Sequence, residues 1–195
     1  IQPPAATVDV TIVIGTYGDR SWIGMAEARA LPSAERQGCP IIHVHGDTLA
    51  SARNDAIRRA TTTWVTVLDA DDEIGPGYCA ALLDGSADIR APRLVRVTSD
   101  GRRQPVRGLQ DRDIEQVNPL PVCSMAPRDL ILSAGGFAEW PHWEDWALWL
   151  TLVRRGATYE HVNGAAYYWH VRLGSRNRTV RKPRTLHRQI REASW

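Results

Sequence analysis

Three carboxylates, Asp69, Asp71 and Asp72, stand within four residues of one another, directly after the apolar run of residues 63–68. Like charges this close repel one another unless a cation or another partner offsets them. Alternate residues of an extended segment project to the same side, so Asp69 and Asp71 can face one ligand together. Their oxygen atoms suit Mg²⁺ or Mn²⁺, which keep bound waters and accept phosphate oxygens. A solvated acidic turn before a helix explains this acid cluster equally well.

A second acidic pair, Glu144 and Asp145, follows Trp143 at the start of an expected helix. Carboxylates beside apolar tryptophan rings can have raised pKa values, which suits them to act as general bases. The alternative is a structural role, because the helix dipole stabilises acids near a helix N-terminus. Tryptophans recur every three residues from position 140 to 149, and we expect most of them to pack in the core.

Two more side chains are candidates for the same site. Arg53 opens a helix after the second predicted strand, where its guanidinium could bind the charged or planar groups of a nucleotide. His170 ends an apolar run and could complete the coordination of a hard cation. Taken alone, an arginine or a histidine of this kind is more often structural. Their roles therefore depend on whether the fold brings them to the acid cluster.

The elements that must position these residues alternate over the first half of the chain. Strands are predicted over residues 8–14, 41–44 and 63–68, and helices over residues 25–31, 49–60 and 76–83. Such alternation is typical of a doubly wound, mostly parallel sheet. Right-handed crossovers then bring the carboxyl ends of the strands, with Thr16, Asp47 and the acid cluster, to one edge, where such sheets bind ligands.

The second half is less regular. Strands are predicted over residues 94–98 and 122–125, and helices over residues 143–155 and after Pro183. Residues 158–162 and 165–170 are predicted to form a hairpin around Asn163-Gly164, a strong two-residue turn signal.

The composition is that of an ordinary globular chain. Hydrophobic residues make 43% and charged residues 24% of the 195 residues, which excludes disordered, collagenous and coiled-coil chains. No apolar run approaches the roughly 20 residues that cross a bilayer. The cysteines at positions 39, 79 and 123 show no paired spacing, which favours buried thiols in a reducing compartment. We therefore expect a single cytoplasmic domain over residues 1–195.

The net charge is only +2, but eight of the 24 bases fall between Arg172 and Arg191 without one acid among them. A basic end of this kind is often only solvated chain. Alternatively, Arg172, Ser175 and Arg176 close over a diphosphate near His170. Bases from Arg178 onward would then bind an anionic partner such as DNA, a nucleotide-linked glycan or an acidic membrane surface.

Five motifs follow one another along the chain. They are Thr11-Ile12-Val13-Ile14-Gly15-Thr16-Tyr17, Ala52-Arg53-Asn54, Leu68-Asp69-Ala70-Asp71-Asp72, Gly135-Gly136-Phe137 and Glu144-Asp145-Trp146-Ala147-Leu148-Trp149. This order resembles that of family 2 glycosyltransferases, and residues 168–172 are similar to the C-terminal strand of that family. The resemblance spans about residues 8–178. It implies a GT-A (Rossmann-like) fold with a mostly parallel central sheet flanked by helices, a nucleotide-sugar donor, favoured as a UDP-sugar, a divalent cation and inversion at the anomeric carbon.

The resemblance also implies donor-binding residues. Thr16 and Tyr17 would hold the nucleoside, Arg53 would contact the nucleotide and Asp69 would face the base or ribose. The family commonly has Asp-Asp-Gly-Ser after its second strand, whereas residues 43–48 here read His-Val-His-Gly-Asp-Thr. Only the aspartate of that segment, Asp47, fits the usual nucleoside-facing role.

The catalytic and metal-binding residues follow from the same resemblance. Asp71 would bind the Mn²⁺ or Mg²⁺ ion that bridges the two phosphates, with His170 near the metal or the diphosphate. Asp145 would be the catalytic base, and Glu144 would support it. Direct displacement needs no covalent nucleophile, which agrees with the absence of a Ser-His-Asp or Cys-His signature.

The expected organisation is one domain with a nucleotide-sugar-binding half over about residues 8–90, an acceptor and catalytic half over about residues 91–170, and a basic tail over residues 171–195. Two other functions are weighed against it. Nucleotidyl transfer would favour a lysine in the loop of residues 15–19, which has none. A non-catalytic nucleic-acid-binding module would leave the acids without a purpose. The acceptor (DNA, a glycan or a protein) and a homodimer are left open.

Overall fold

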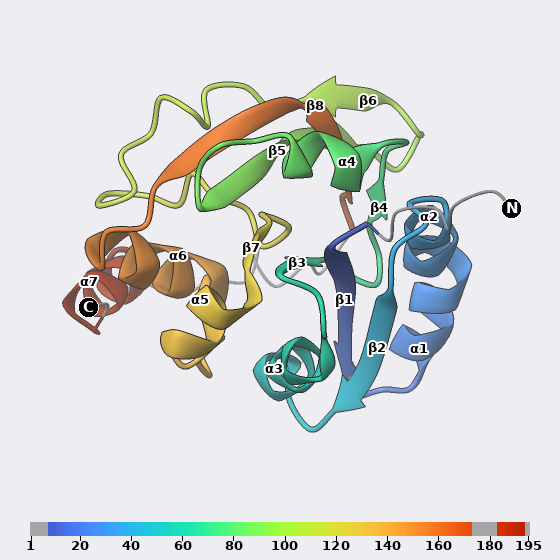
Figure 1. The fold of residues 1–195 in the computed structure, drawn as a ribbon, viewed down its shortest axis with the longest axis horizontal. Coiled ribbons are helices and arrows are strands. Elements are labelled where there is room, and N and C mark those ends of the chain that lie inside the picture. The colour runs from blue at the N-terminus through green and yellow to red at the C-terminus, as the bar shows by residue number, and fades with distance from the viewer. Residues whose placement is uncertain (1–7, 173–182, 194–195) are drawn as a thin grey trace, which may run out of the picture.

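The computed structural model describes residues 8–172 and 183–193, which form two four-stranded sheets with helices packed around them (Figure 1). The first sheet contains, in spatial order, β2 (Ile41–Gly46), β1 (Val10–Tyr17), β3 (Trp64–Val67) and β7 (Ala126–Pro127). The second contains β4 (Glu73–Ile74), β8 (Tyr159–His170), β5 (Ile89–Val97) and β6 (Arg103–Pro105). In Figure 1, β5 and β8 run across the direction of β1 and β2. Within the described ranges, no helix has the length and apolar character needed to span a membrane.

The first sheet confirms the expected α/β arrangement. Strands β1, β2 and β3 are parallel, and only the short β7 is antiparallel. Its flanking helices are α1 (Ser21–Met25), one π-helical turn η1 (Ala26–Ala30), α2 (Leu31–Glu35) and α3 (Leu49–Arg59). Ile12 and Ile14 share a core cluster with Ala26 and Ala30, whereas Val13 belongs to the cluster that contains α3. Both faces of β1 are therefore covered, as is typical of a strand in the expected parallel sheet.

Two of the predicted strands differ from those in the structure. Residues 15–17, expected in a loop, continue β1, because β2 runs alongside them and pairs Thr16 with His45 and Tyr17 with Gly46. Residues 122–125, expected to be a strand, pair only through an isolated bridge between Met125 and Arg90, and β7 comes directly after them.

The hairpin predicted around Asn163-Gly164 is also wrong. Residues 159–170 form the single strand β8, which pairs in parallel with β5 over its length. The pairing shifts between Pro92, opposite Val162, and Arg93, opposite Ala166, so the Asn-Gly pair lies in a bulge rather than a turn. The local turn signal loses because β5, from a distant part of the chain, provides hydrogen-bond partners on both sides of it.

The remaining helices are α4 (Tyr78–Leu83), α5 (Arg128–Ser133), α6 (Glu144–Arg154) and α7 (Pro183–Ala193). Helix α7 lies against α6 (Figure 1), and its Leu186 and Ile190 are buried in one core cluster with Trp146 and Trp149. Both tryptophans of α6 therefore pack in the core, as expected, and the partly buried Trp140 and Trp143 pack against the same cluster. The described part of the basic tail, however, belongs to the folded domain and is not a solvated end.

Candidate functional site

Arg53 joins two of the acidic motifs. Its Nη2 lies 2.7 Å from Asp69 Oδ1 and its Nη1 lies 2.8 Å from Glu144 Oε1. The three side chains come from α3, from the turn after β3 and from the first turn of α6. The fold thus brings three predicted site residues together, although Glu144 is 91 positions from Arg53.

The guanidinium of Arg53 is enclosed, with 2% of its side chain exposed. A Cβ atom at Gly15 of β1 would lie 2.9 Å from Arg53 Cγ, so the strand makes room for the arginine by having a glycine there. Burial opposes the positive charge, but Asp69 and Glu144 outweigh it and raise the pKa of Arg53 above its ordinary value. Arg53 is therefore a fixed cation committed to two carboxylates, and its contact with a nucleotide stays a prediction.

The neighbouring Asn54 explains the Gly-Gly-Phe motif. Its side-chain amide donates to the Phe137 carbonyl and accepts from the Phe137 N–H, both at 2.8 Å. Gly136 has φ of 75°, and a Cβ atom there would lie 2.3 Å from Asn54 Oδ1. The Phe137 ring lies 5.3 Å from Arg53 Cζ. The motif therefore attaches the segment before α6 to α3.

Asp145 has a defined hydrogen-bonding environment at the start of α6. Its Oδ1 accepts the N–H of Trp146 and its Oδ2 accepts from Asn118 Nδ2, both at 2.9 Å. Burial, and then the charge of Glu144, raise the pKa of Asp145 to about 7. A carboxylate that titrates near neutral pH is suited to exchange protons with a substrate hydroxyl.

The residue before this pair, Trp143, has a left-handed backbone with φ of 56°. This conformation is costly for a bulky residue and persists only where its surroundings enforce it. The ring of His187 on α7 lies 4.3 Å from the Trp143 ring and 4.9 Å from the Trp146 ring. Helix α7 therefore helps to hold the start of α6, where Glu144 and Asp145 lie.

The acids of the cluster face different surroundings. Asp72 is buried and accepts from Tyr167 Oη at 2.9 Å and from the His170 N–H at 2.8 Å. Burial, followed by the charges of Asp69 and Asp71, raises its pKa well above the ordinary range. Asp71 keeps 24% of its side chain exposed, and Arg172 Nη1 lies 3.7 Å from its carboxylate. Asp72 thus ties the cluster to β8, while Asp71 is partly exposed and paired with Arg172.

His170 is close to the cluster but already engaged. Its Nε2 lies 2.7 Å from Glu73 Oε2. Across the described ranges, no three His, Cys, Asp or Glu side chains form a group that could hold a metal ion by themselves. A role of His170 as a metal ligand therefore stays a prediction, which would require its ring to leave Glu73.

The ends of β1 and β2 meet through histidines. Thr16 Oγ1 lies 3.0 Å from His43 Nε2 and 3.1 Å from His45 Nδ1. Burial lowers the pKa of His43. The buried Thr16 hydroxyl is thus occupied, while Tyr17 is half-buried and Asp47 is exposed just beyond β2.

Arg172 is the last of the predicted donor-binding residues that the structure describes. Its Cζ lies 5.0 Å from the centre of the Trp22 ring, near the start of α1. Ser175 and Arg176 lie outside the described residues.

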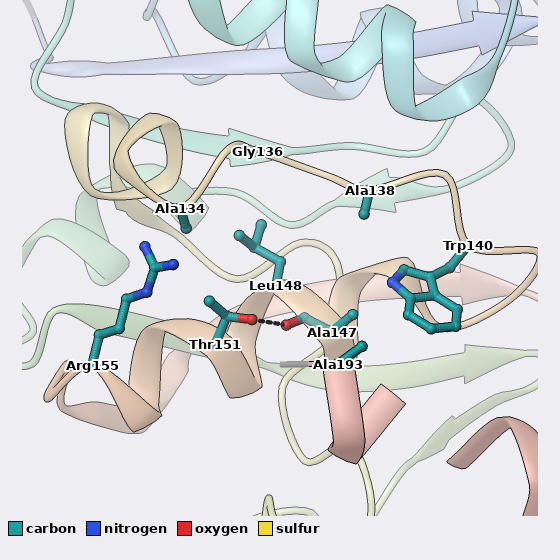
Figure 2. A pocket seen from close by; sticks show the side chains of 9 residues that line it. All are labelled: Ala134, Gly136, Ala138, Trp140, Ala147, Leu148, Thr151, Arg155 and Ala193. Atoms are coloured by element: carbon teal, nitrogen blue, oxygen red, sulfur yellow. Dashed lines mark hydrogen bonds between the residues drawn. The ribbon is translucent and has the colours of Figure 1, made fainter. Parts of the chain in front are cut away.

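A pocket of about 220 Å³ lies elsewhere, between α5, α6 and the end of α7 (Figure 2). Its walls include Trp140 at one end and Arg155 at the other, with Thr151 bonded to the Ala147 carbonyl between them. No predicted site residue lines it. The candidate site is therefore the surface around the acid cluster and Asp145, not this pocket.

Sequence reasoning missed two residues of the site. Tyr167 donates to Asp72 and accepts the Asp69 N–H at 3.2 Å, and its place in the strand that ends at His170 was the available signal. Asn118 had no such signal, because an asparagine before a proline indicates only a turn.

Comparison with known proteins adds a family match over part of the chain and a fold. Residues 15–105 match the family model described as Glycosyl transferase family 2. No curated protein matches the chain.

Solved structures of S. aureus TarS resemble the chain. The structure of TarS 1-349 in complex with UDP-GlcNAc has a TM-score of 0.65 at 15% identity, covering 93% of this chain and 64% of that one. The complex with UDP has a TM-score of 0.60 at 16% identity, covering 83% and 60%. A further TarS structure has a TM-score of 0.61 at 17% identity, covering 83% and 36%. The chain thus spans less than two thirds of the length of these structures, and the likeness shows the GT-A fold.

Proposed function

We propose that this chain, a family 2 glycosyltransferase of the GT-A fold, moves a sugar from a nucleotide-sugar donor to an acceptor hydroxyl by direct displacement, with inversion at the anomeric carbon. One observation carries the proposal. Arg53 binds Asp69, which follows β3, and Glu144, which precedes Asp145, at 2.7 and 2.8 Å. It thereby joins the strand-end acids expected to face the donor to the helix that carries the expected base.

Asp145 is proposed as the general base. Its carboxylate would accept the proton of the acceptor hydroxyl as the oxygen attacks the anomeric carbon. A pKa of about 7 leaves a large share of Asp145 deprotonated at neutral pH while keeping it basic enough to take a proton. Glu144 contributes through its charge and through Arg53, which fixes the first turn of α6.

The donor is proposed to bind along the carboxyl ends of β1, β2 and β3. Tyr17, Asp47 and Asp69 present the groups expected to face the nucleoside, and Thr16 orders the ends of the first two strands through its two histidine contacts. A UDP-sugar is the proposed class, supported by the similar structures that contain UDP-GlcNAc and UDP. We propose that Arg172 binds the diphosphate together with Ser175 and Arg176.

A divalent cation fits one acid of the cluster. Asp69 is held by Arg53 at 2.7 Å and Asp72 by Tyr167 at 2.9 Å, whereas the described ion pair of Asp71, with Arg172, is longer at 3.7 Å and leaves the carboxylate 24% exposed. Mg²⁺ and Mn²⁺ commonly bind one or two carboxylates and complete their shells with substrate phosphates and water. Asp71 is therefore the proposed protein ligand. When bound, the cation would offset the negative charge that develops on the leaving diphosphate.

The test measures binding and slow hydrolysis of UDP-GlcNAc, of a second UDP-sugar and of a GDP-sugar, with Mn²⁺ and with excess chelator. We expect cation-dependent binding of a UDP-sugar, lost in Asp71→Ala and kept in the exposed control Asp84→Ala. Asp145→Asn should keep donor affinity and lower kcat by about 10²–10⁴, the usual worth of general-base catalysis.

Three results would contradict the proposal. Full activity of Asp71→Ala in excess chelator would show that the reaction needs no metal at Asp71. Full activity of Asp145→Asn would show that Asp145 is not the general base. If the protein turned over a nucleoside triphosphate with a sugar phosphate but no nucleotide sugar, its reaction would be nucleotidyl transfer and not sugar transfer.

A further inference from the structure

Asn118 makes a contact that the proposed reaction does not yet use. It lies in the irregular segment between β6 and β7, 27 positions before Asp145, and its Nδ2 donates to Asp145 Oδ2 at 2.9 Å. Its own Oδ1 accepts the Leu120 N–H at 3.1 Å. Because that second bond fixes the carbonyl end of the amide, the NH₂ end is directed at Asp145.

The segment that carries Asn118 is fastened along α6. Trp146 Nε1 donates to the Ile114 carbonyl at 2.8 Å, and Arg154 pairs with Glu115 at 2.5 Å. The first of these bonds starts from the residue next to Asp145. Asn118 is therefore held at a fixed place relative to the carboxylate that it contacts.

We propose that Asn118 is a positioning residue for the base, which holds the Asp145 carboxylate in one orientation and favours its charged form. The inference rests on the proposed function, in which Asp145 takes the proton of the acceptor. With Trp146 N–H on Oδ1 and Asn118 on Oδ2, rotation of the carboxylate would break both bonds. Each oxygen keeps a lone pair for the acceptor hydroxyl.

The charges around Asp145 explain why such a donor matters. Glu144 on the same helix and Asp69 after β3 both favour the protonated form, as burial does, while Arg53 on α3 opposes them. A hydrogen bond donated to a carboxylate favours its charged form, so Asn118, like Arg53, lowers the pKa of Asp145. Without it, less of the base would be charged at neutral pH.

Asn118→Ala removes the donated hydrogen bond without adding a charge, whereas Asn118→Asp removes it and also places a second carboxylate beside Asp145. Aspartate has the shape of asparagine and still accepts the Leu120 N–H, but when ionised it cannot donate to Asp145. For Asn118→Ala we expect the acid limb of kcat/KM for hydrolysis of UDP-GlcNAc to move up by about one pH unit and kcat at pH 7 to fall about fivefold, with donor affinity unchanged. Asn118→Asp should move the limb further in the same direction, because its charge adds to the loss of the donor. Glu115→Gln, which loosens the same segment at its exposed ion pair with Arg154, should leave the profile as in wild type.

The outcomes separate this inference from the proposed function. Asn118→Ala with the wild-type profile, in a series where Asp145→Asn has lost kcat, overturns the inference alone. Full activity of Asp145→Asn would show that Asp145 is not the general base, and would therefore contradict the proposed function. Titration of the Asp145 carboxyl by ¹³C NMR gives a readout without turnover, and an equal midpoint in wild type and Asn118→Ala would also overturn the inference.

Discussion

Replacing Arg53 by methionine tests whether the buried cation holds the site together. Methionine fills part of the same space but removes the charge that offsets Asp69 and Glu144. The arginine side chain is 2% exposed, whereas that of Glu144 is 13% and that of Asp69 is 32% exposed. The carboxylates are therefore unequal, because Asp69 can regain water and Glu144 can regain little.

The structure gives a magnitude for this change. Removing one partner of a buried ion pair costs about 3–5 kcal/mol, because the remaining charge is left without its counter-charge in a dry site. The exposure of Asp69 places the expected loss at the lower end, about 3 kcal/mol of unfolding free energy. For a chain of this length that loss lowers Tm by about 6–12 °C. Loss of the Arg53 charge should also raise the pKa of Asp145 further and move the acid limb of the rate profile upward.

The assay is urea unfolding at pH 7, with two matched variants. Arg58→Met removes an arginine of the same helix that is 59% exposed and 3.9 Å from Asp55, and it should change stability by less than about 0.5 kcal/mol. Arg53→Lys keeps the charge but lacks the fork that reaches two carboxylates, so its stability should lie between Arg53→Met and wild type. If Arg53→Met and Arg58→Met are equally stable, the reasoning about the buried cation is refuted.

Two further predictions concern the contact between Gly136 and Asn54 and the raised pKa of Asp145. Gly136→Ala should lower the free energy of unfolding by about 2–4 kcal/mol, because the new Cβ would lie 2.3 Å from Asn54 Oδ1. The control Gly135→Ala has φ of 88° and open space around the new Cβ, so it should show only the cost of the backbone conformation. Equal losses of the two variants in urea unfolding would contradict the steric argument. Asp145 holds its proton to about pH 7 when folded but loses it in the ordinary aspartate range when unfolded, so its contribution to stability should fall by up to about 4 kcal/mol as the pH rises through that window. Unfolding measured from pH 4 to pH 8 should show this slope in wild type and not in Asp145→Asn, and parallel curves would show that Asp145 has no raised pKa.

The positions of the acids in the elements could be derived from the sequence. The acid cluster directly follows a short apolar strand, and Glu144 and Asp145 open a tryptophan-rich helix, so each motif is placed by its immediate neighbours. Period-two and helical spacing are properties of a few consecutive residues, which is why β1, β2, β3 and α3 were predictable. A parallel sheet then requires the strand ends to meet at one edge.

Where local and distant preferences disagreed, the distant partner decided. Asn163-Gly164 is a good turn by its own dihedral preferences, yet β5 pairs on either side of it and keeps β8 a single strand. The basic sequence after Pro183 gives little sign of a core helix, yet Leu186 and Ile190 find an apolar face on α6. Burial of apolar area depends on what lies opposite, which a local pattern does not contain.

The sequence by itself determined which residues carry charge and at which element ends they lie. Only the tertiary structure decided their partners: Arg53 between Asp69 and Glu144, and Asn118 on Asp145. Those partners are 16, 91 and 27 positions apart in the chain, and no spacing rule links such distances. The partners are selected because a buried charge or amide costs free energy until it is paired, and the folded chain decides which group is within reach.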